Sequence, residues 1–324
     1  MTTADESRGS GWERLVGVRR PYDAAPASVH SWVEALLGAP VVEATPRVGG
    51  MSPAVAVSLR AANGSRAFVK AVSPAINPDS PQHFRHEIAV LSALSSLPPV
   101  PYRARLLSTY DDGDWVAIAI EDIDGRHPEW SSPADRARVL EVVRQQSREL
   151  TPVPPCMPQD ASYGGIVKYL EKMTTATPEE VAALPSWASD ELPMLLGLAQ
   201  RTLDHQHAES FCHTDIRHDN ILMRHHDGQP LLLDWGMSRR GQRWGDTMVF
   251  ALEWIDSRYF DEIVATIGLT PAEEDDVTGF VAAMGCYLLM AAVHPPPPSL
   301  PNLPAFRRQV GAACLAGVRR RLNA

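Results

Sequence analysis

One stretch in the second half of the chain, residues 211–236, constrains the fold and the chemistry more than any other. It reads FCHTDIRHDNILMRHHDGQPLLLDWG, with a short apolar entry, a polar loop and two apolar runs. The polar positions, in order, are His213, Asp215, Arg217, Asn220 and Asp234. Asp227-Gly228 between the two runs is a strong hairpin signal. The stretch therefore predicts two antiparallel strands whose open end carries the polar residues.

The length of the hairpin loop decides which of these residues face each other. A three-residue loop of His226–Gly228, with Gly228 left-handed, pairs residue 225 with 229 and places Asn220 opposite Asp234. Directly opposed residues have Cβ atoms about 4.5–5.5 Å apart, which suits a shared metal ion. A two-residue loop would turn Asn220 to the other face. We therefore expect the three-residue loop, with a bulge at Gly228.

The residue types in this stretch match the requirements of kinase-type phosphoryl transfer. That reaction needs a carboxylate near the accepting hydroxyl, and an amide and a second carboxylate to hold Mg²⁺ on the phosphates. Asp215 is the expected base or hydroxyl-orienting carboxylate, and Asn220 and Asp234 are the expected metal ligands. We expect His213 to brace the loop by hydrogen bonding. Arg217 is a candidate for contact with the transferring phosphoryl group, and the alternative is a solvated loop arginine.

Two charged residues upstream form a candidate phosphate clamp. Lys70 lies in the alternating run AFVKAV, and Glu87 lies on the next predicted helix, on the side toward the strands. A strand lysine held by a helix glutamate positions the α- and β-phosphates of a nucleotide. Alone, the two would be unrelated surface charges, but the downstream motif favours the functional interpretation. The turn that contains Gly49, Gly50 and Ser52 would let backbone amides approach phosphate, although a plain hairpin turn explains it equally well.

The pattern over the whole chain predicts an α+β protein with two lobes. Expected strands, arranged in part as an antiparallel meander, cover residues 41–48, 55–61, 67–72, 105–110 and 115–121. Expected helices cover residues 28–37, 80–97, 133–150, 163–174, 193–207, 246–265, 271–293 and 305–322. We therefore expect an irregular segment at 1–27, a small sheet-containing N-lobe at 28–122, and a larger, mainly helical C-lobe at 123–324.

Composition narrows the class of partner. With 324 residues the chain is long enough for two packed lobes, and its net charge of −9 argues against nucleic acid as a main partner. The four cysteines are scattered along the sequence, which indicates reduced thiols. The polar N-terminus lacks the apolar core of a signal peptide. We therefore expect a cytoplasmic protein without a membrane partner. The crowded histidines match no zinc signature. The acidic run at Glu253, Asp256, Asp261 and Glu262 fits either a cationic acceptor or a solvated helix face. Asp246 is expected to cap the next helix, with bracing of the catalytic loop as a second role, although capping alone explains its position.

At these residues the chain resembles the aminoglycoside phosphotransferase and choline kinase group within the protein-kinase-like fold. The resemblance rests on HTDIRHDN, LLLDWG, RWGDTMVFAL and AIAIEDIDG, with Lys70 and Glu87, and covers roughly residues 40–290. It implies ATP, or GTP, between the lobes, with adenine on the hinge backbone of Glu121, Asp122 and Ile123. It also implies two Mg²⁺ ions and transfer of the γ-phosphoryl group to a small-molecule hydroxyl. Thr214 stands where many relatives carry glycine, which leaves the subfamily open.

Several functions remain as alternatives at this point. The acceptor is an aminoglycoside or another antibiotic, or a metabolite such as an amino alcohol, a sugar or a homoserine-like compound. A protein kinase is disfavoured because few residues separate Asp234 from Gly245-Asp246 and no Ala-Pro-Glu follows. An inactive nucleotide-binding scaffold is disfavoured because every charged residue of the set is present. The oligomeric state is a monomer or a homodimer.

Overall fold

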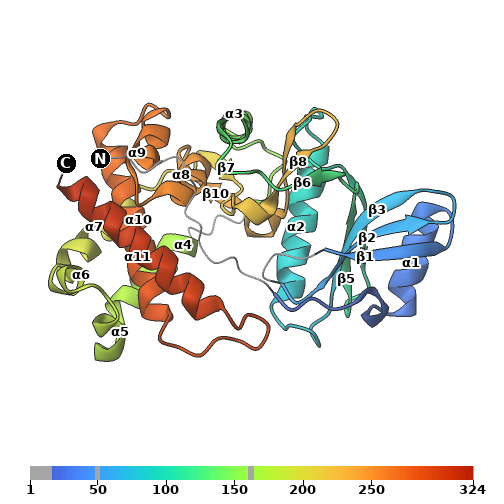
Figure 1. Cartoon of the computed structure of the whole chain (residues 1–324), viewed down its shortest axis with the longest axis horizontal. Helices are drawn as coiled ribbons and strands as arrows, with labels where there is room; N and C mark the ends of the chain where they lie inside the picture. Colours follow the sequence, from blue (N-terminus) through green and yellow to red (C-terminus); the bar gives the residue numbers. More distant parts are fainter. Residues whose placement is uncertain (1–16, 48–51, 160–163, 324) are drawn as a thin grey trace.

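The computed structural model describes residues 17–47, 52–159 and 164–323. Its N-terminal part contains a five-stranded antiparallel sheet with two helices, and its C-terminal part is mainly helical (Figure 1). This arrangement confirms the predicted α+β class. The predicted phosphate-binding glycines, Gly49 and Gly50, lie outside the described residues.

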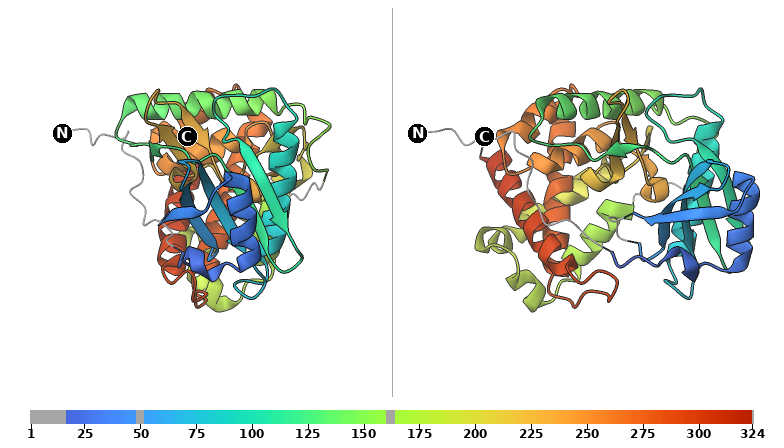
Figure 2. Two further views of the ribbon diagram at one scale, coloured as in Figure 1. Left: turned by 90° about the vertical axis from the view of Figure 1, so that its right-hand side faces the viewer. Right: turned by 45° about the vertical axis from the view of Figure 1, so that its right-hand side comes forward.

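The sheet has the strand order β1-β2-β3-β5-β4. Its strands are β1 (Val41–Pro46), β2 (Val55–Ala61), β3 (Arg66–Val72), β4 (Leu106–Asp111) and β5 (Val116–Ile120). Alternation along β5 divides the two faces, because successive side chains point in opposite directions. Ala117 and Ala119 pack with helix α1 (Ala27–Leu37), whereas Val116 and Ile118 pack with helix α2 (Ser80–Ser95). One helix therefore covers each face (Figure 2).

Helix α2 connects the sheet with the C-terminal part. Phe84 and Leu91 of α2 belong to the same buried cluster as Val72 of β3. That cluster also contains Phe211 and Trp235, which flank the catalytic stretch. The helix that carries Glu87 is therefore packed between the sheet and the segment that directly follows Asp234.

The C-terminal part is organised around α10 (Pro271–Ala291), which is buried along most of its length. The other helices are α3 (Pro133–Glu149), α4 (Gly164–Thr174), α5 (Pro178–Ala182), α6 (Ser186–Asp190), α7 (Leu192–Asp204), α8 (Gly245–Ala251), α9 (Arg258–Ala265) and α11 (Leu303–Leu322). Gly279 lets α10 approach α7 closely, since a Cβ there would lie 2.7 Å from the carbonyl oxygen of Leu198. Within the described ranges, no helix combines the length and apolar character needed to cross a membrane.

Short strands carry the catalytic stretch. They are β6 (Gly125–Arg126), β7 (Ser210–Cys212), β8 (Ile221–Arg224), β9 (Pro230–Leu232) and β10 (Arg239–Gly241). Strands β6, β8 and β9 form one sheet, and β7 pairs with β10 in another. Three further elements in this region are single 3₁₀ turns at His218–Asn220, Trp235–Met237 and Leu252–Trp254.

The predicted register of the β8–β9 hairpin is wrong by one residue. Ile221 pairs with Leu232, so Asn220 lies opposite Leu233, whose N–H donates to the Asn220 carbonyl at 2.9 Å. The loop has four residues, because the N–H of Gly228 donates to the carbonyl of Arg224 at 2.8 Å. The Asp227 side chain stabilises this turn by pairing with Arg224 at 2.6 Å and accepting from the N–H of Gln229. Gly228 has the expected left-handed conformation, with φ of +67°.

Candidate active site

The packing of α2 on the sheet brings Lys70 and Glu87 together. The Lys70 Nζ lies 2.8 and 2.5 Å from the two Glu87 carboxylate oxygens, and 3.3 Å from Oδ1 of Asp234. Burial lowers the pKa of Lys70, but the charges of Asp234 and Glu87 outweigh it, so that the pKa lies above its usual value. Burial raises the pKa of Glu87 to about 6, although Lys70 opposes the shift. The three side chains thus form one buried charge cluster.

Asp234 takes an uncommon backbone conformation at the end of the hairpin. Its φ is +65°, in the left-handed region that non-glycine residues rarely adopt. Burial raises the pKa of Asp234, but the charge and hydrogen bond of Lys70 outweigh it and hold the pKa below its usual range. The side chain keeps 44% of its surface exposed, which leaves it accessible to a ligand. Strained non-glycine residues of this kind are concentrated at functional sites.

Asp215 and Asn220 are brought together by the loop itself. The Asn220 Nδ2 donates to the Asp215 carboxylate at 2.8 Å and to the Asp215 carbonyl at 2.9 Å. The Arg217 guanidinium lies 3.1 Å from Asp215 and 3.2 Å from Asp219. Burial lowers the pKa of Arg217, but the charges of Asp215 and Asp219 outweigh it and raise the pKa. Arg217 is therefore held in the loop by two carboxylates.

His213 is fully buried and holds the loop against the hairpin. Its Nδ1 accepts from the N–H of Asp215 at 3.3 Å, which assigns the proton to Nε2, and Nε2 donates to the Leu233 carbonyl at 2.9 Å. The ring also packs 4.7 Å from that of Trp235. The catalytic loop and the segment that follows β9 therefore meet at this side chain.

Of the two roles predicted for Asp246, bracing of the catalytic loop is confirmed and capping of the next helix is wrong. Helix α8 begins at Gly245, so Asp246 lies in its first turn rather than before it. Its carboxylate accepts from the N–H groups of His213 and Thr214, both at 2.9 Å, and from Gln146 at 2.9 Å. The backbone N–H groups of the loop need these acceptors, because the loop is irregular and, among the described residues, has no neighbouring strand whose carbonyl groups could accept from them.

The predicted hinge residues differ in their contacts. The N–H of Glu121 donates to the Arg105 carbonyl at 3.0 Å. The Asp122 carboxylate pairs with Arg66 at 2.5 Å and accepts from Ser58 at 2.5 Å, so this side chain ties strands of the sheet together. The backbone of Ile123 forms no hydrogen bond with any described residue. Ser52 accepts a hydrogen bond from the N–H of Ala54 at 3.3 Å.

The predicted Mg²⁺ ligands supply the oxygen atoms that this ion prefers. No described His, Cys, Asp and Glu residues form a group of three or more arranged to hold a metal. Mg²⁺ in phosphoryl-transfer sites is instead bound by one or two protein side chains together with substrate phosphates. The Asn220 Nδ2 is occupied by Asp215, and no described donor contacts its Oδ1. The accessible Asp234 carboxylate and this amide oxygen fit such a site.

A positively charged residue near the site, Arg19, was not predicted. The N–H of Val18 donates to the carbonyl of Ser299 at 3.2 Å, and the N–H of Arg20 donates to the carbonyl of Ala54 at 3.4 Å. Residues 18–20 thus connect the C-terminal part with the start of β2. Burial lowers the pKa of Arg19, and the charge of Asp234 opposes the shift. No motif or periodicity in GVRRPY marks this position.

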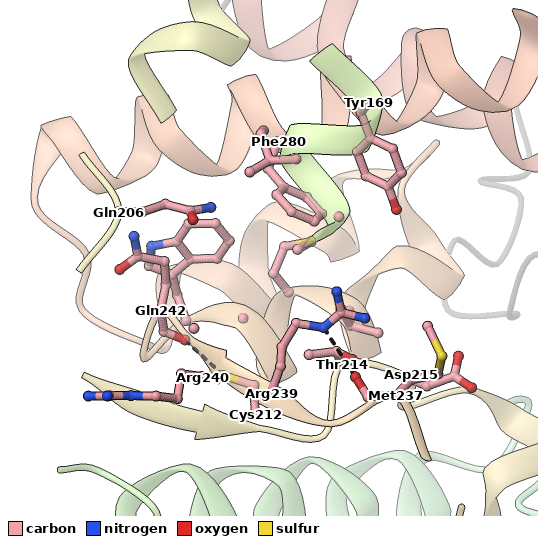
Figure 3. A pocket seen from close by; sticks show the side chains of 17 residues that line it. Tyr169, Gln206, Cys212, Thr214, Asp215, Met237, Arg239, Arg240, Gln242 and Phe280 are labelled. Atoms are coloured by element: carbon pink, nitrogen blue, oxygen red, sulfur yellow. Dashed lines mark hydrogen bonds between the residues drawn. The ribbon is translucent and has the colours of Figure 1, made fainter. Parts of the chain in front are cut away.

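A cavity of about 250 Å³ borders Asp215 (Figure 3). Its wall is formed by residues of α4, α8, α10, the β7–β10 pair and the segments that adjoin them, including Tyr169, Thr214, Arg239, Trp244 and Phe280. None of the predicted acidic run, Glu253 to Glu262, lines it. Asp261 instead pairs with Arg320 at 3.0 Å and Arg321 at 2.6 Å. This cavity therefore lacks the acidic wall that a cationic acceptor would favour.

Comparisons with known structures find the same fold in several kinases. Choline kinase LicA from Streptococcus pneumoniae superposes with a TM-score of 0.61 and 12% identity over 91% of this chain and 98% of that chain. A thermostable mutant of the aminoglycoside phosphotransferase APH(4)-Ia, in a complex with ADP and hygromycin B, has a TM-score of 0.59 and 12% identity, covering 90% and 98%. A putative fructosamine-3-kinase from Haemophilus somnus has a TM-score of 0.50 and 11% identity, covering 89% and 96%. At these identities the likeness establishes the fold alone.

Sequence comparison establishes the family. No curated protein matches the chain. Residues 43–276, most of the chain, match the phosphotransferase enzyme family (APH). This range contains both the Lys70–Glu87 pair and the catalytic stretch. The chain belongs to the phosphotransferase enzyme family and is a small-molecule kinase with the protein-kinase-like fold.

Proposed function

We propose that the protein transfers the γ-phosphoryl group of ATP to a hydroxyl group of a small molecule, with Asp215 as the base. The observation that carries this proposal is the position of Asp215. Its carboxylate is held by Asn220 and Arg217, and it also borders the cavity of about 250 Å³. A carboxylate placed between a candidate acceptor cavity and a charged cluster is what hydroxyl phosphorylation requires.

The proposed step exchanges one bond to phosphorus for another. A lone pair of the acceptor hydroxyl oxygen forms the new bond to the γ-phosphorus. The bond from that phosphorus to the oxygen bridging to the β-phosphate breaks, ADP leaves, and the hydroxyl proton passes to Asp215. Asn220 and Arg217 orient the carboxylate, and Asp246 keeps the loop backbone in place. Such positioning supplies much of the rate enhancement in phosphoryl transfer.

On the phosphate side, Lys70 is the proposed contact to the α- and β-phosphates, with Glu87 fixing its direction. Asn220 and Asp234 are the proposed Mg²⁺ ligands, and the bound ion would offset negative charge on the phosphates. Arg19 adds a positive charge close to Asp234. The backbone of Ile123, which forms no hydrogen bond with any described residue, is the proposed contact for adenine, whereas the Asp122 side chain has a structural role.

Two classes of acceptor follow from the similar structures. The aminoglycoside phosphotransferase was studied with hygromycin B, and LicA is a choline kinase. An antibiotic and a metabolite are therefore both compatible with this fold, and the choice depends on the cavity beside Asp215.

An ADP-release assay with a panel of alcohols tests the proposal. We expect Mg²⁺-dependent ADP formation that depends on the acceptor, and a loss of kcat of about 10²- to 10⁴-fold in Asp215→Asn. Nucleotide binding should be unchanged in that variant. Asp114→Asn, at the exposed turn between β4 and β5, is the matched control and should retain turnover. Turnover that Asp215→Asn leaves intact would refute the role of Asp215, and nucleotide binding without any acceptor-dependent turnover would favour the inactive scaffold.

A further inference from the structure

The cavity beside Asp215 contains an arginine that points into it. Arg239 begins β10 and lies opposite Cys212 of β7. Its Nε donates to the carbonyl of Met237 at 3.1 Å, which fixes the direction of the guanidinium. Figure 3 shows the guanidinium leaving the strand toward the space below the rings of Tyr169 and Phe280. The remaining N–H groups are thus directed at whatever fills the cavity.

Arg239 is partly buried but, within the described residues, lacks a carboxylate partner for an ion pair, a property that it shares with Arg240 and Arg307. Three other partly buried arginines do form such pairs, with N–O distances of 3.1, 2.8 and 2.6 Å: Arg217, Arg243 and Arg321. Burial lowers the pKa of Arg239, and the neighbouring charges only partly offset this effect. A desolvated cation is costly unless an anion accompanies it, so this position favours an anionic ligand.

The rest of the cavity indicates the shape of that ligand. Phe280, Trp244 and Met248 supply apolar wall, and the only carboxylate among the described lining residues is Asp215. Burial raises the pKa of Tyr169 to about 12, so its hydroxyl is a neutral donor at neutral pH. The buried Oε1 of Gln206 lacks a hydrogen-bond partner in the described structure and borders the same space. A cavity of about 150 Å³ holds benzene, so this one holds a single substituted ring.

We infer that the phosphate acceptor is a compact alcohol with an apolar or aromatic body and an anionic group, such as a carboxylate, that binds Arg239. This inference rests on the proposed function. The hydroxyl lies at Asp215, the body lies against the apolar wall that Phe280 and Trp244 form together, and the anion lies at the guanidinium. Cationic acceptors are disfavoured because Arg239 repels them. Arginine binds carboxylates through two parallel hydrogen bonds, which would also orient the hydroxyl.

The competing role for Arg239 is contact with the transferring phosphoryl group. In that role, its loss would affect ATP and every acceptor alike. If Arg239 is instead a specificity residue, its substitution changes the affinity for anionic acceptors and leaves the KM for ATP unchanged. The two roles therefore differ in which substrate responds.

Three matched alcohols provide the test: 4-(hydroxymethyl)benzoate, 4-(hydroxymethyl)benzamide and 4-(hydroxymethyl)benzylamine. They share one ring and one primary alcohol, and differ only in being anionic, neutral or cationic. Binding to the full chain is measured by calorimetry with Mg²⁺ and a non-hydrolysable ATP analogue, and turnover is measured by ADP release. We expect the benzoate to bind at least about tenfold more tightly than the benzylamine.

Substitution of Arg239 decides whether this preference comes from the guanidinium. Arg239→Met should weaken binding of the benzoate by about ten- to a hundredfold and abolish the preference, and Arg239→Lys should restore part of it. Arg240→Met is the control, because Arg240 also borders the cavity but donates to the Ala208 carbonyl at 3.2 Å and to Gln159 at 3.5 Å. It removes the same charge from the next residue and should keep the preference.

The outcomes separate this inference from the proposed function. Equal or tighter binding of the benzylamine overturns the inference, as does an absence of binding by all three compounds. An Arg239→Met variant that keeps the preference but raises the KM for ATP overturns it in favour of the phosphoryl contact. If the benzoate binds through Arg239 but no alcohol supports ADP release, the inference stands and the proposed function fails.

Discussion

The carboxylate of Asp246 lies 2.9 Å from the backbone nitrogen of Thr214, the residue directly before Asp215. Thr214 has φ of +62°, a conformation that β-branched residues rarely adopt. The same carboxylate accepts from the N–H of His213 and from Gln146. The position of Asp215 therefore depends on an aspartate that is 31 residues away in the sequence and has no contact with the cavity.

Asp246→Ala should lower both stability and kcat. Three donors lose their acceptor in a buried site, which should reduce the free energy of unfolding by about 2–4 kcal/mol. The loop then holds Asp215 less firmly, and kcat should fall at least about tenfold. Urea denaturation and ADP release measure the two effects. Asp261→Ala is the control, since it breaks the ion pairs with Arg320 and Arg321 and should lower stability without changing kcat of the folded enzyme.

Thr214 combines an unfavourable backbone conformation with a favourable hydrogen bond. Its hydroxyl donates to the Met237 carbonyl at 2.6 Å. Thr214→Val keeps the positive φ and loses this bond, so it should destabilise by about 1 kcal/mol or more. Thr214→Gly loses the bond but relieves strain of about 1–3 kcal/mol. We therefore expect the glycine variant to be more stable than the valine variant in urea denaturation, and the reverse order would show that Thr214 is unstrained.

Sequence patterns predicted the helices and strands, and also the residue pairs whose facing positions follow from local periodicity. Alternation along β3 and the helical phase of α2 placed Lys70 and Glu87 on facing surfaces, and the structure joins them at 2.5 Å. The hairpin register was wrong because a single side chain, Asp227, decides between turns that differ by one residue. Turn length is a small energetic choice made by local hydrogen bonds, which spacing alone does not reveal.

Residues whose roles depend on tertiary packing were missed for a different reason. Arg19 lies in an irregular segment, and its place near Asp234 depends on backbone contacts with Ser299 and Ala54 from two distant regions. Arg239 lies only a few residues after the motif LLLDWG in the sequence. Its distance from that motif, however, does not identify it as a residue that contacts the acceptor. Only the packing of α4 and α10 over β10 reveals the cavity that it enters.

Arg19→Ala should weaken ATP binding. Because the Arg19 charge acts on Asp234, its loss leaves more negative charge where the phosphates are proposed to bind. We expect the KM for ATP to rise by about tenfold, with the KM for the acceptor little changed. Arg19→Lys should recover part of the loss. Arg20→Ala is the control, since the Arg20 residue is exposed and its backbone contact with Ala54 remains. Equal behaviour of the two alanine variants would rule out a specific role for Arg19.

The raised pKa of Glu87 predicts how the stability of the nucleotide-free and metal-free protein changes with pH. Burial moves the pKa of this carboxyl from 4.5 to about 6 on folding, so the folded state holds the proton more tightly than the unfolded state. The resulting stabilisation is present below pH 4.5 and is lost as the pH rises through about 6. Such a shift corresponds to about 2 kcal/mol, which is the most that Glu87 contributes.

Glu87→Gln removes this titration and provides the measurement. Urea denaturation in EDTA at pH values from 4 to 8 should show the wild type losing stability relative to Glu87→Gln by up to ~2 kcal/mol, mainly over the interval between the two pKa values. Above that interval the difference should stay constant, because both states of Glu87 are then ionised. Glu141→Gln, an exposed site on α3, should show no such trend. A difference that is flat or changes in the opposite direction would mean that Lys70 outweighs burial at this carboxyl.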